Sequence, residues 1–286
     1  MLMVLLKKTC GFAMIVTAAV VLANLQAVQA AGSSDQVAGD LTYEPQIGAL
    51  YKSEGQALYR RDGRAKQWST VPFAAQSGSA KVVSIAFSAG EQNQLYVAGP
   101  GIGVLKSANA GMTWEHIDRG LPSRNVTAFT THSTVPDTIF AVVTGEGIYR
   151  SEDGGGQWRM VDKGPEAEIR RLIHSNLEGS MQSGWLFAAT DKGVYRSMDC
   201  FCGWRTAGNL TGPVSAVAYD PKQPMELFAS VGQQLFRTEN GGEEWKMMGT
   251  AGAEITALTY SPTGILHALL SDGGVVQSQD KGQRWQ

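Results

Sequence analysis

The feature that most constrains this fold is a tryptophan that recurs at a nearly constant interval. It is found at Trp68, Trp114, Trp158, Trp204, Trp245 and Trp285. The intervals are 46, 44, 46, 41 and 40 residues. A repeat of this length is typical of a solenoid, a propeller or an array of small units. The chain is therefore expected to contain about six copies of one supersecondary unit.

Each repeat has the same internal pattern, which is clearest in the third copy. Residues 126–130, 138–143 and 147–151 are short β-prone runs, Trp158 opens a fourth, and turn residues separate them. Four short antiparallel strands per repeat match the blade of a β-propeller. A parallel β-helix would need shorter coils, and an α-solenoid would need a 3.6-residue apolar spacing that the sequence lacks. The pattern predicts an all-β fold, a six-bladed propeller formed as a single domain by residues 41–286.

The two ends of the repeat region bear on how the ring closes. The sixth repeat stops at Gln286, one residue after its tryptophan, and the first is recognisable from residues 48–52 and 57–60. A closed ring avoids unpaired sheet edges and exposed apolar faces at both ends. We expect a segment near residues 36–46 to join the first and last blades, as the outer strand of blade six or the inner strand of blade one.

The first thirty residues have the composition of a targeting segment. Lys7 and Lys8 precede an apolar run over residues 11–25, and Val28-Gln29-Ala30 supplies small residues where a signal peptidase cuts. Residues 1–30 are predicted to be a secretory signal peptide, the alternative being an uncleaved anchor, and residues 31–40 a flexible lead-in. We therefore expect an exported protein, periplasmic or extracellular.

Charge argues against nucleic acid as a partner. Without residues 1–30, 22 basic residues face 26 acidic ones, a formal charge of −4. A nucleic-acid-binding domain of this size would carry a basic excess.

The tryptophans end a recurring polar turn with the pattern Ser/Thr-x-Asp/Asn-x-Gly-x-x-Trp. Its Asp or Asn can accept backbone N–H groups of the loop, and its Gly permits a positive φ. The Trp ring can bury about 150–250 Å² in each blade. These residues are therefore expected to be structural: Asn109, Trp114, Asp153, Trp158, Asp199, Trp204, Asn240, Trp245, Asp280 and Trp285. The copy around Asp199 lacks the Gly, and the copy before Trp68 keeps only the Trp.

This turn resembles the Asp-box, or BNR repeat, of sialidases, xyloglucan-active glycoside hydrolases, sortilin-type receptors and the photosystem II assembly and stability factor family. The run Gly-Val/Ile-Tyr-Arg-Ser before the turn is most similar to the assembly factor family. That resemblance implies an exported, non-enzymatic, monomeric propeller that binds a protein of an envelope or membrane complex. If the source is photosynthetic, the location implied is the thylakoid lumen. The alternative is a carbohydrate-binding or glycoside-hydrolysing propeller.

A cation stands just before the turn in most repeats. These cations are Arg60, Lys106, Arg150, Arg196 and Arg237. Repeated around a ring, they could form a basic patch for carboxylates of a partner protein. The alternative is that each pairs with an acid of the next blade or lies along that blade.

Few other residues suggest chemistry. Cys200 and Cys202 could form a disulfide or a redox pair within the fourth turn. The four histidines, His116, His132, His174 and His267, show no ligand spacing, so we expect no metal and no cofactor.

A glycoside hydrolase needs two carboxylates about 5–9 Å apart. The sequence has no Phe/Tyr-Arg-Ile/Leu-Pro motif of sialidases and no Gly-x-Ser-x-Gly elbow. Asp62, Glu146 and Asp191 could line a cleft, but nothing in their surroundings distinguishes them from solvated loop acids. We therefore predict a protein without catalytic residues.

Overall fold

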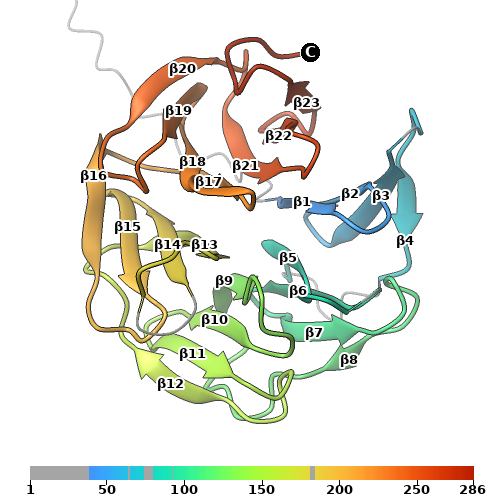
Figure 1. Cartoon of the computed structure of the whole chain (residues 1–286). Coiled ribbons are helices and arrows are strands. Elements are labelled where there is room, and N and C mark those ends of the chain that lie inside the picture. The colour runs from blue at the N-terminus through green and yellow to red at the C-terminus, as the bar shows by residue number, and fades with distance from the viewer. Residues whose placement is uncertain (1–38, 64, 74–79, 92, 181–183) are drawn as a thin grey trace, which may run out of the picture. The chain divides into compact units, whose positions relative to one another are not determined.

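A computed structural model describes residues 39–286, except for residues 64, 74–79, 92 and 181–183. These residues form 23 β-strands in six antiparallel sheets, and none of the described residues is helical. The sheets are arranged around a common centre as the blades of a propeller (Figure 1). The predicted all-β, six-bladed propeller is confirmed.

We number the blades in chain order. Blade one has β1 (Leu41–Glu44), β2 (Ala49–Glu54), β3 (Ala57–Asp62) and β4 (Ser69–Val71); blade two has β5 (Ser84–Phe87), β6 (Leu95–Gly99), β7 (Gly103–Ser107) and β8 (Glu115–His116). Blade three has β9 (Val126–Thr131), β10 (Ile139–Val143), β11 (Gly147–Ser151) and β12 (Arg159–Asp162); blade four has β13 (Ile169–Ser175), β14 (Trp185–Thr190), β15 (Gly193–Met198) and β16 (Arg205–Thr211). Blade five has β17 (Ala216–Asp220), β18 (Gln223–Val231), β19 (Gln234–Thr238) and β20 (Lys246–Thr250); blade six has β21 (Ile255–Tyr260), β22 (Leu266–Leu270) and β23 (Val275–Ser278).

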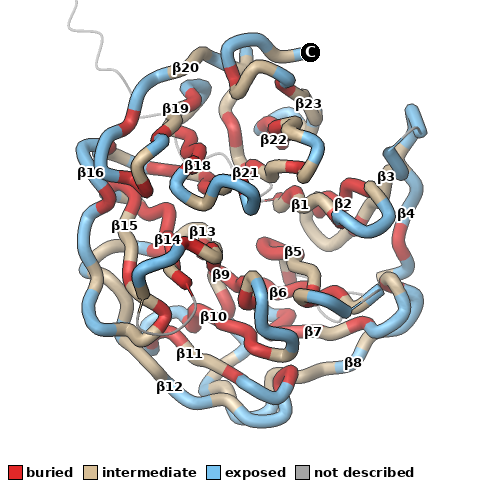
Figure 2. The backbone as a smooth tube through the Cα atoms, in the orientation of Figure 1, coloured by how far each residue is buried: buried red, intermediate tan, exposed pale blue. Residues whose placement is uncertain are grey.

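Burial follows the position of a strand within its blade. The second strands β6, β10 and β22 are buried at every residue, because each blade is covered by a neighbour on both faces. This explains why their sequences are mostly apolar instead of alternating between apolar and polar residues. The fourth strands β12 and β20 lie at the rim and are largely exposed (Figure 2).

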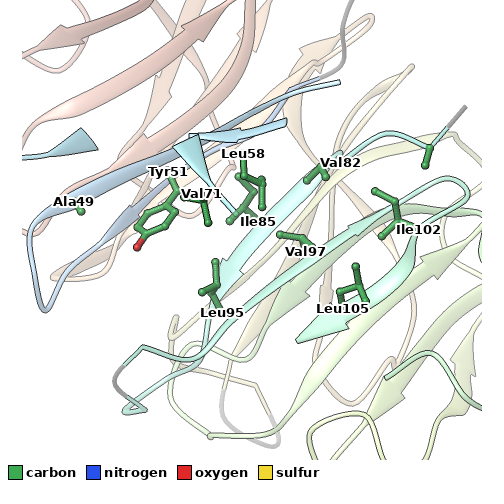
Figure 3. Close-up of a cluster of buried hydrophobic side chains, with 11 residues drawn as sticks. Ala49, Tyr51, Leu58, Val71, Val82, Ile85, Leu95, Val97, Ile102 and Leu105 are labelled. Carbon is green, nitrogen blue, oxygen red and sulfur yellow. The ribbon is translucent and has the colours of Figure 1, made fainter. Parts of the chain in front are cut away.

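The core consists of apolar clusters between adjacent blades. Between blades one and two, Tyr51 and Leu58 meet Ile85 and Val97 (Figure 3). The Tyr51 ring packs edge-on against Phe87, with centroids 5.1 Å apart. Fully burying each such side chain contributes roughly 1.5–3 kcal/mol. Because each cluster is shared, the free energy of burial also holds neighbouring blades together.

The ring closes where β1 meets β21. Strand β1 pairs along its whole length with β2, so it is the inner strand of blade one, which decides between the two placements expected for residues 36–46. The Tyr43 N–H donates to Thr259 Oγ1 at 3.2 Å across the seam, and Leu41 packs in a cluster with Ala257. Side-by-side packing of blades one and six therefore closes the described ring.

The predicted signal and most of the lead-in lie outside the described residues. Asp40, which we assigned to the flexible lead-in, belongs to the propeller, because its carboxylate accepts the backbone N–H of Ile85 at 2.7 Å. No helix among the residues described is long and apolar enough to span a membrane.

Candidate functional site

A cavity of about 600 Å³ is lined by the inner strands of all six blades. These strands surround the centre of the ring (Figure 1). Its lining includes the aromatic residues Tyr43, Phe87, Phe129, Tyr219 and Tyr260. Threonine and serine side chains and three prolines, Pro45, Pro221 and Pro262, complete much of the wall. A large, partly apolar cavity with dispersed hydrogen-bonding groups is the usual place for a ligand. The central cavity is therefore the candidate functional site.

The floor of the central cavity is an arginine from blade four. Arg171, on β13, donates hydrogen bonds to the carbonyl oxygens of Val83 and Gly39 and, at 3.4 Å, of Thr256. These carbonyls belong to different parts of the ring, so one side chain ties them together. A second cavity of about 280 Å³ is also lined by Arg171 and, with Thr127 and Thr256, lies at the other ends of the inner strands. The guanidinium thus divides the channel in two.

Among the described residues, two carboxylates line the central cavity, those of Asp40 and Glu44. Asp40 Oδ1 lies 3.8 Å from Arg171 Nε, and burial raises the pKa of Asp40 although Arg171 offsets part of the shift. Glu44 is 5% exposed, and its Oε1 accepts the Gln46 N–H at 3.1 Å. Burial also raises the pKa of Glu44. Glu44 Oε2 has no hydrogen-bond partner among the described residues.

The three acids considered as cleft residues are not brought into this cavity. Asp62 ends β3 and pairs with Arg60, Glu146 lies in the turn between β10 and β11, and Asp191 Oδ1 accepts the Glu168 N–H at 2.8 Å. Each belongs to a different blade.

The five cations before the turns all have acidic partners. Arg60 pairs with Asp62 at 2.7 Å, Lys106 with Asp137 at 3.8 Å, Arg150 with Glu152 at 2.9 Å, Arg196 with Glu243, and Arg237 with Glu226 and Glu239. Their side chains are between 12% and 32% exposed. The charges expected to form a basic patch are therefore compensated, and their role in binding stays a prediction.

The recurring turns, which we call corner loops, share one set of hydrogen bonds in four blades. They comprise residues 107–114, 151–158, 238–245 and 278–285. In the blade-three copy, Ser151 Oγ accepts the Gly155 N–H at 2.8 Å and donates to Asp153 Oδ1 at 2.7 Å, and Asp153 Oδ1 accepts the Gln157 N–H at 2.9 Å. These bonds lower the pKa of Asp153. These contacts cap backbone N–H groups of the loop, which is the role expected for the Ser and Asp side chains.

The corner-loop tryptophans also connect blades. Trp114, Trp158 and Trp245 donate Nε1–H to the carbonyl oxygens of Pro72, Ile117 and Ala207, and Trp204 donates to Asp162 Oδ1. Each acceptor lies on or beside the fourth strand of the preceding blade. The tryptophan thus ties the outer edge of one blade to the next.

The corner loop of blade four, residues 197–204, is built differently. Asp199 is 1% exposed and points away from its own loop, with Oδ2 3.8 Å from His132 Nε2 and 3.7 Å from His174 Nε2. The two imidazole rings pack with centroids 3.8 Å apart. Burial lowers the pKa of His132, and lowers that of His174 to about 3, because a charged imidazole is poorly solvated there. Both histidines are neutral at pH 7.

The hydrogen bonds of these histidines decide what the cluster can do. Its three ligand-type atoms lie within 4.8 Å of one another, close enough to surround an ion. However, His132 Nδ1 accepts the backbone N–H groups of Thr134 and Val135, at 3.1 and 2.9 Å, and His174 Nδ1 accepts that of Ser133 at 3.2 Å. A neutral imidazole that accepts at Nδ1 carries its proton on Nε2. The Nε2–H groups therefore face the Asp199 carboxylate, and neither Nε2 has a lone pair for a metal.

The sequence did contain a signal for this cluster. His132 and His174 are 42 residues apart, which is about one repeat, so both come from the end of an inner strand in consecutive blades. The expected absence of ligand spacing did not take the repeat length into account. In a repeat protein, two residues that are one repeat apart in the sequence lie at equivalent positions of adjacent repeats and are therefore close in space.

Cys200 and Cys202 form a disulfide within the same loop. A cross-link that closes only three residues stabilises a fold by about 1.6 kcal/mol in the chain-entropy model, against about 3 kcal/mol for a 15-residue loop. The bond joins no separate elements of the propeller.

Comparison with known proteins relates the chain to solved structures alone. No protein-family model and no curated protein matches the sequence. A GH74 enzyme of Niastella koreensis is 17% identical, with a TM-score of 0.62 over 86% of this chain and 46% of that one. YCF48 bound to a D1 peptide is 18% identical, with a TM-score of 0.53 over 86% and 80%. A structure of the nidogen/laminin complex is 13% identical, with a TM-score of 0.65 over 80% and 88%.

The likeness is one of fold. These identities are too low to carry a function, and the chain spans less than half the length of the GH74 enzymes of Niastella koreensis and Xanthomonas campestris. The neighbours include both enzymes and propellers in complexes with a peptide or a protein.

Proposed function

We propose that this chain is a non-enzymatic propeller that binds a segment of a partner protein in its central cavity. In this role it serves as a scaffold or assembly factor for an envelope or membrane complex. The cavity carries the proposal, because it is large enough for several side chains and its wall is aromatic, proline-rich and hydroxylated.

Two further observations support a protein partner. YCF48 and the nidogen/laminin complex are propeller structures with a bound peptide or protein. The resemblance of the corner loops to Asp-box repeats of the assembly factor family agrees with this class. An exported chain, cleaved after residue 30, would meet such a partner in the periplasm or outside the cell.

The proposal is tested by filling the central cavity with a large side chain and, as a control, filling the smaller cavity in the same way. Thr42 lines the central cavity and Thr127 lines the smaller cavity at the other end, and both are partly exposed threonines of inner strands. We expect Thr42→Trp to abolish capture of a partner from the native envelope, while Thr127→Trp leaves capture unchanged. Equal capture by both folded variants would rule out the central cavity. A third variant, with Arg150, Arg196 and Arg237 replaced together, tests the cations separately.

A carbohydrate ligand is the alternative, favoured by the aromatic residues Tyr43 and Tyr260 at the cavity wall. Aromatic faces stack on sugar rings as readily as on peptide side chains. Incubation with chromogenic glycosides and polysaccharides distinguishes the two, because turnover that disappears on replacing one carboxylate would establish a glycosidase and reject the scaffold.

A further inference from the structure

We infer that the Cys200–Cys202 disulfide is a thiol–disulfide exchange site that oxidises a pair of cysteines of a partner protein. This site lies on the corner loop of blade four, and the inference does not depend on the central cavity. It is carried by the placement of the two cysteines, by the contacts that hold the loop, and by the small contribution of the bond to the fold.

The two cysteines of the disulfide differ in their exposure to solvent. Cys202 is exposed and Cys200 is half-buried. A thiol approaching from solvent therefore meets Cys202 first. Exchange requires such access, since a thiolate must approach one sulfur in line with the bond that breaks.

The loop is held in place by contacts that do not involve the disulfide. Asp199, directly before Cys200, is buried against His132 and His174. Phe201, between the cysteines, packs at 6.0 Å from the ring of Phe140 in the cluster between blades three and four. These two anchors face inward on either side of Cys200 in the sequence. They keep the loop folded when the disulfide opens, as a reversible redox site requires.

The other corner loops hold their turns without a disulfide. The loops of blades two, three, five and six hold the same turn with a Ser or Thr oxygen that accepts the N–H of a glycine. In blade four, Asp199 and Phe201 replace those bonds as anchors. A cross-link that adds little to the fold and is reachable from solvent is placed for chemistry.

The reaction balances without an added oxidant, because the disulfide is the oxidant. A thiolate of the partner attacks Sγ of Cys202, the Cys200–Cys202 bond breaks, and Cys200 leaves as a thiolate that takes a proton from water. The partner's second thiolate then attacks the partner sulfur of the mixed disulfide and releases Cys202. The partner gains a disulfide and loses two electrons, and Cys200 and Cys202 gain those electrons as two thiols.

The test uses the full chain with Cys10→Ser, which leaves Cys200 and Cys202 as its cysteines. The oxidised chain is mixed with one equivalent of a synthetic peptide that has two reduced cysteines, and both are followed by intact mass. We expect one peptide disulfide to form for each chain reduced, while the circular dichroism of the chain remains native. A chain that stays oxidised, or that reacts only at its unfolding rate, would overturn the inference.

Matched single variants identify the attacked sulfur. With glutathione disulfide as the probe, Cys200→Ser should hold one glutathione per chain at Cys202, and Cys202→Ser should be modified far more slowly at the half-buried Cys200. Equal trapping by the two variants contradicts the proposed direction of attack. The double variant Cys200→Ser/Cys202→Ser should fold and melt close to the parent chain. If it does not fold, the disulfide is a structural cross-link and the inference is wrong.

Discussion

The corner loops of blades three and four occupy the same place in consecutive blades and are stabilised in two different ways. In residues 151–158 the polar side chains turn back onto the loop, and Ser151 and Asp153 satisfy its own backbone N–H groups. In residues 197–204 the equivalent Asp199 turns inward to two histidines, one of them from blade three. The polar contacts of the first loop are made within the loop itself, whereas Asp199 of the second loop contacts residues outside its loop.

The difference follows from one position in the motif. Gly155 has φ +99°, and a Cβ there would lie 2.6 Å from the Cβ of Ile117, so only glycine allows the loop to fold back so closely. Blade four has Phe201 at this position, with φ +56°, and its ring packs between blades instead. An aspartate that recurs at the same position of the motif thus has two different structural roles within one chain.

Removing the aspartate of each loop should change the free energy of unfolding by the most different amounts. Asp199→Ala removes a buried carboxylate whose Oδ2 lies 3.7 and 3.8 Å from the Nε2 atoms of two buried histidines, so we expect a loss of about 2.5 kcal/mol in the free energy of unfolding. Asp153→Ala should cost much less, because the N–H groups that it caps can bind water. Urea unfolding followed by tryptophan fluorescence measures both.

Asp199→Asn is the matched control for that experiment. It keeps an oxygen that can face the two imidazoles but removes the charge, so its stability should lie between those of the parent and Asp199→Ala. If Asp199→Ala and Asp153→Ala prove equally stable, the two loops are equivalent and the contrast between them fails.

The fold was predictable because it is repeated. Six tryptophans at a nearly constant interval, with β-prone runs between them, indicated blade number and strand order before any contact was known. The sequence left two placements for the closing segment near residues 36–46, as the outer strand of blade six or the inner strand of blade one. Only the pairing of β1 with β2 and its contact with β21 decided it.

The candidate site was much less predictable. The cavity is built from inner strands of all six blades, and Arg171 crosses it to carbonyls far away in the sequence, so no local motif marks it. The inward turn of Asp199 was hidden as well, because its position matches the capping residues of the other blades. The missing glycine at Phe201 was the local sign that this loop differs.

The second expected effect is a dependence of stability on pH that originates in blade four. An unfolded histidine titrates near 6.5, but burial lowers the pKa of His174 to about 3 in the folded chain. As pH falls from 7.5 to 5, the unfolded chain binds a proton at this residue and the folded chain does not. Stability therefore decreases with falling pH, by about 2 kcal/mol from His174 over this range.

The measurement is the free energy of unfolding at several pH values for the parent chain and His174→Gln. The variant should lose stability less steeply between pH 7.5 and 5. His267, whose pKa burial lowers to about 4, remains in both chains and sets a common background. A variant in blade three, such as Ser151→Ala, should keep the parent slope. Parallel curves for His174→Gln and the parent would show that His174 is accessible to protons in the folded state.

The smallest difference in stability is expected between variants of the serines that begin the two loops. Ser151→Ala leaves the buried Gly155 N–H without an acceptor and should cost about 1.5 kcal/mol. Within the described part of the chain, Ser197 Oγ donates to the carbonyl oxygen of Met198 at 3.1 Å and accepts no glycine N–H, so Ser197→Ala should cost about 0.5 kcal/mol. The shift of the urea midpoint is the measurement, and Ser278→Ala, in a loop of the blade-three type, should behave as Ser151→Ala does. If Ser197→Ala costs as much as the other two, the blade-four loop relies on its serine after all, and its dependence on Asp199 and Phe201 is smaller than the contacts indicate.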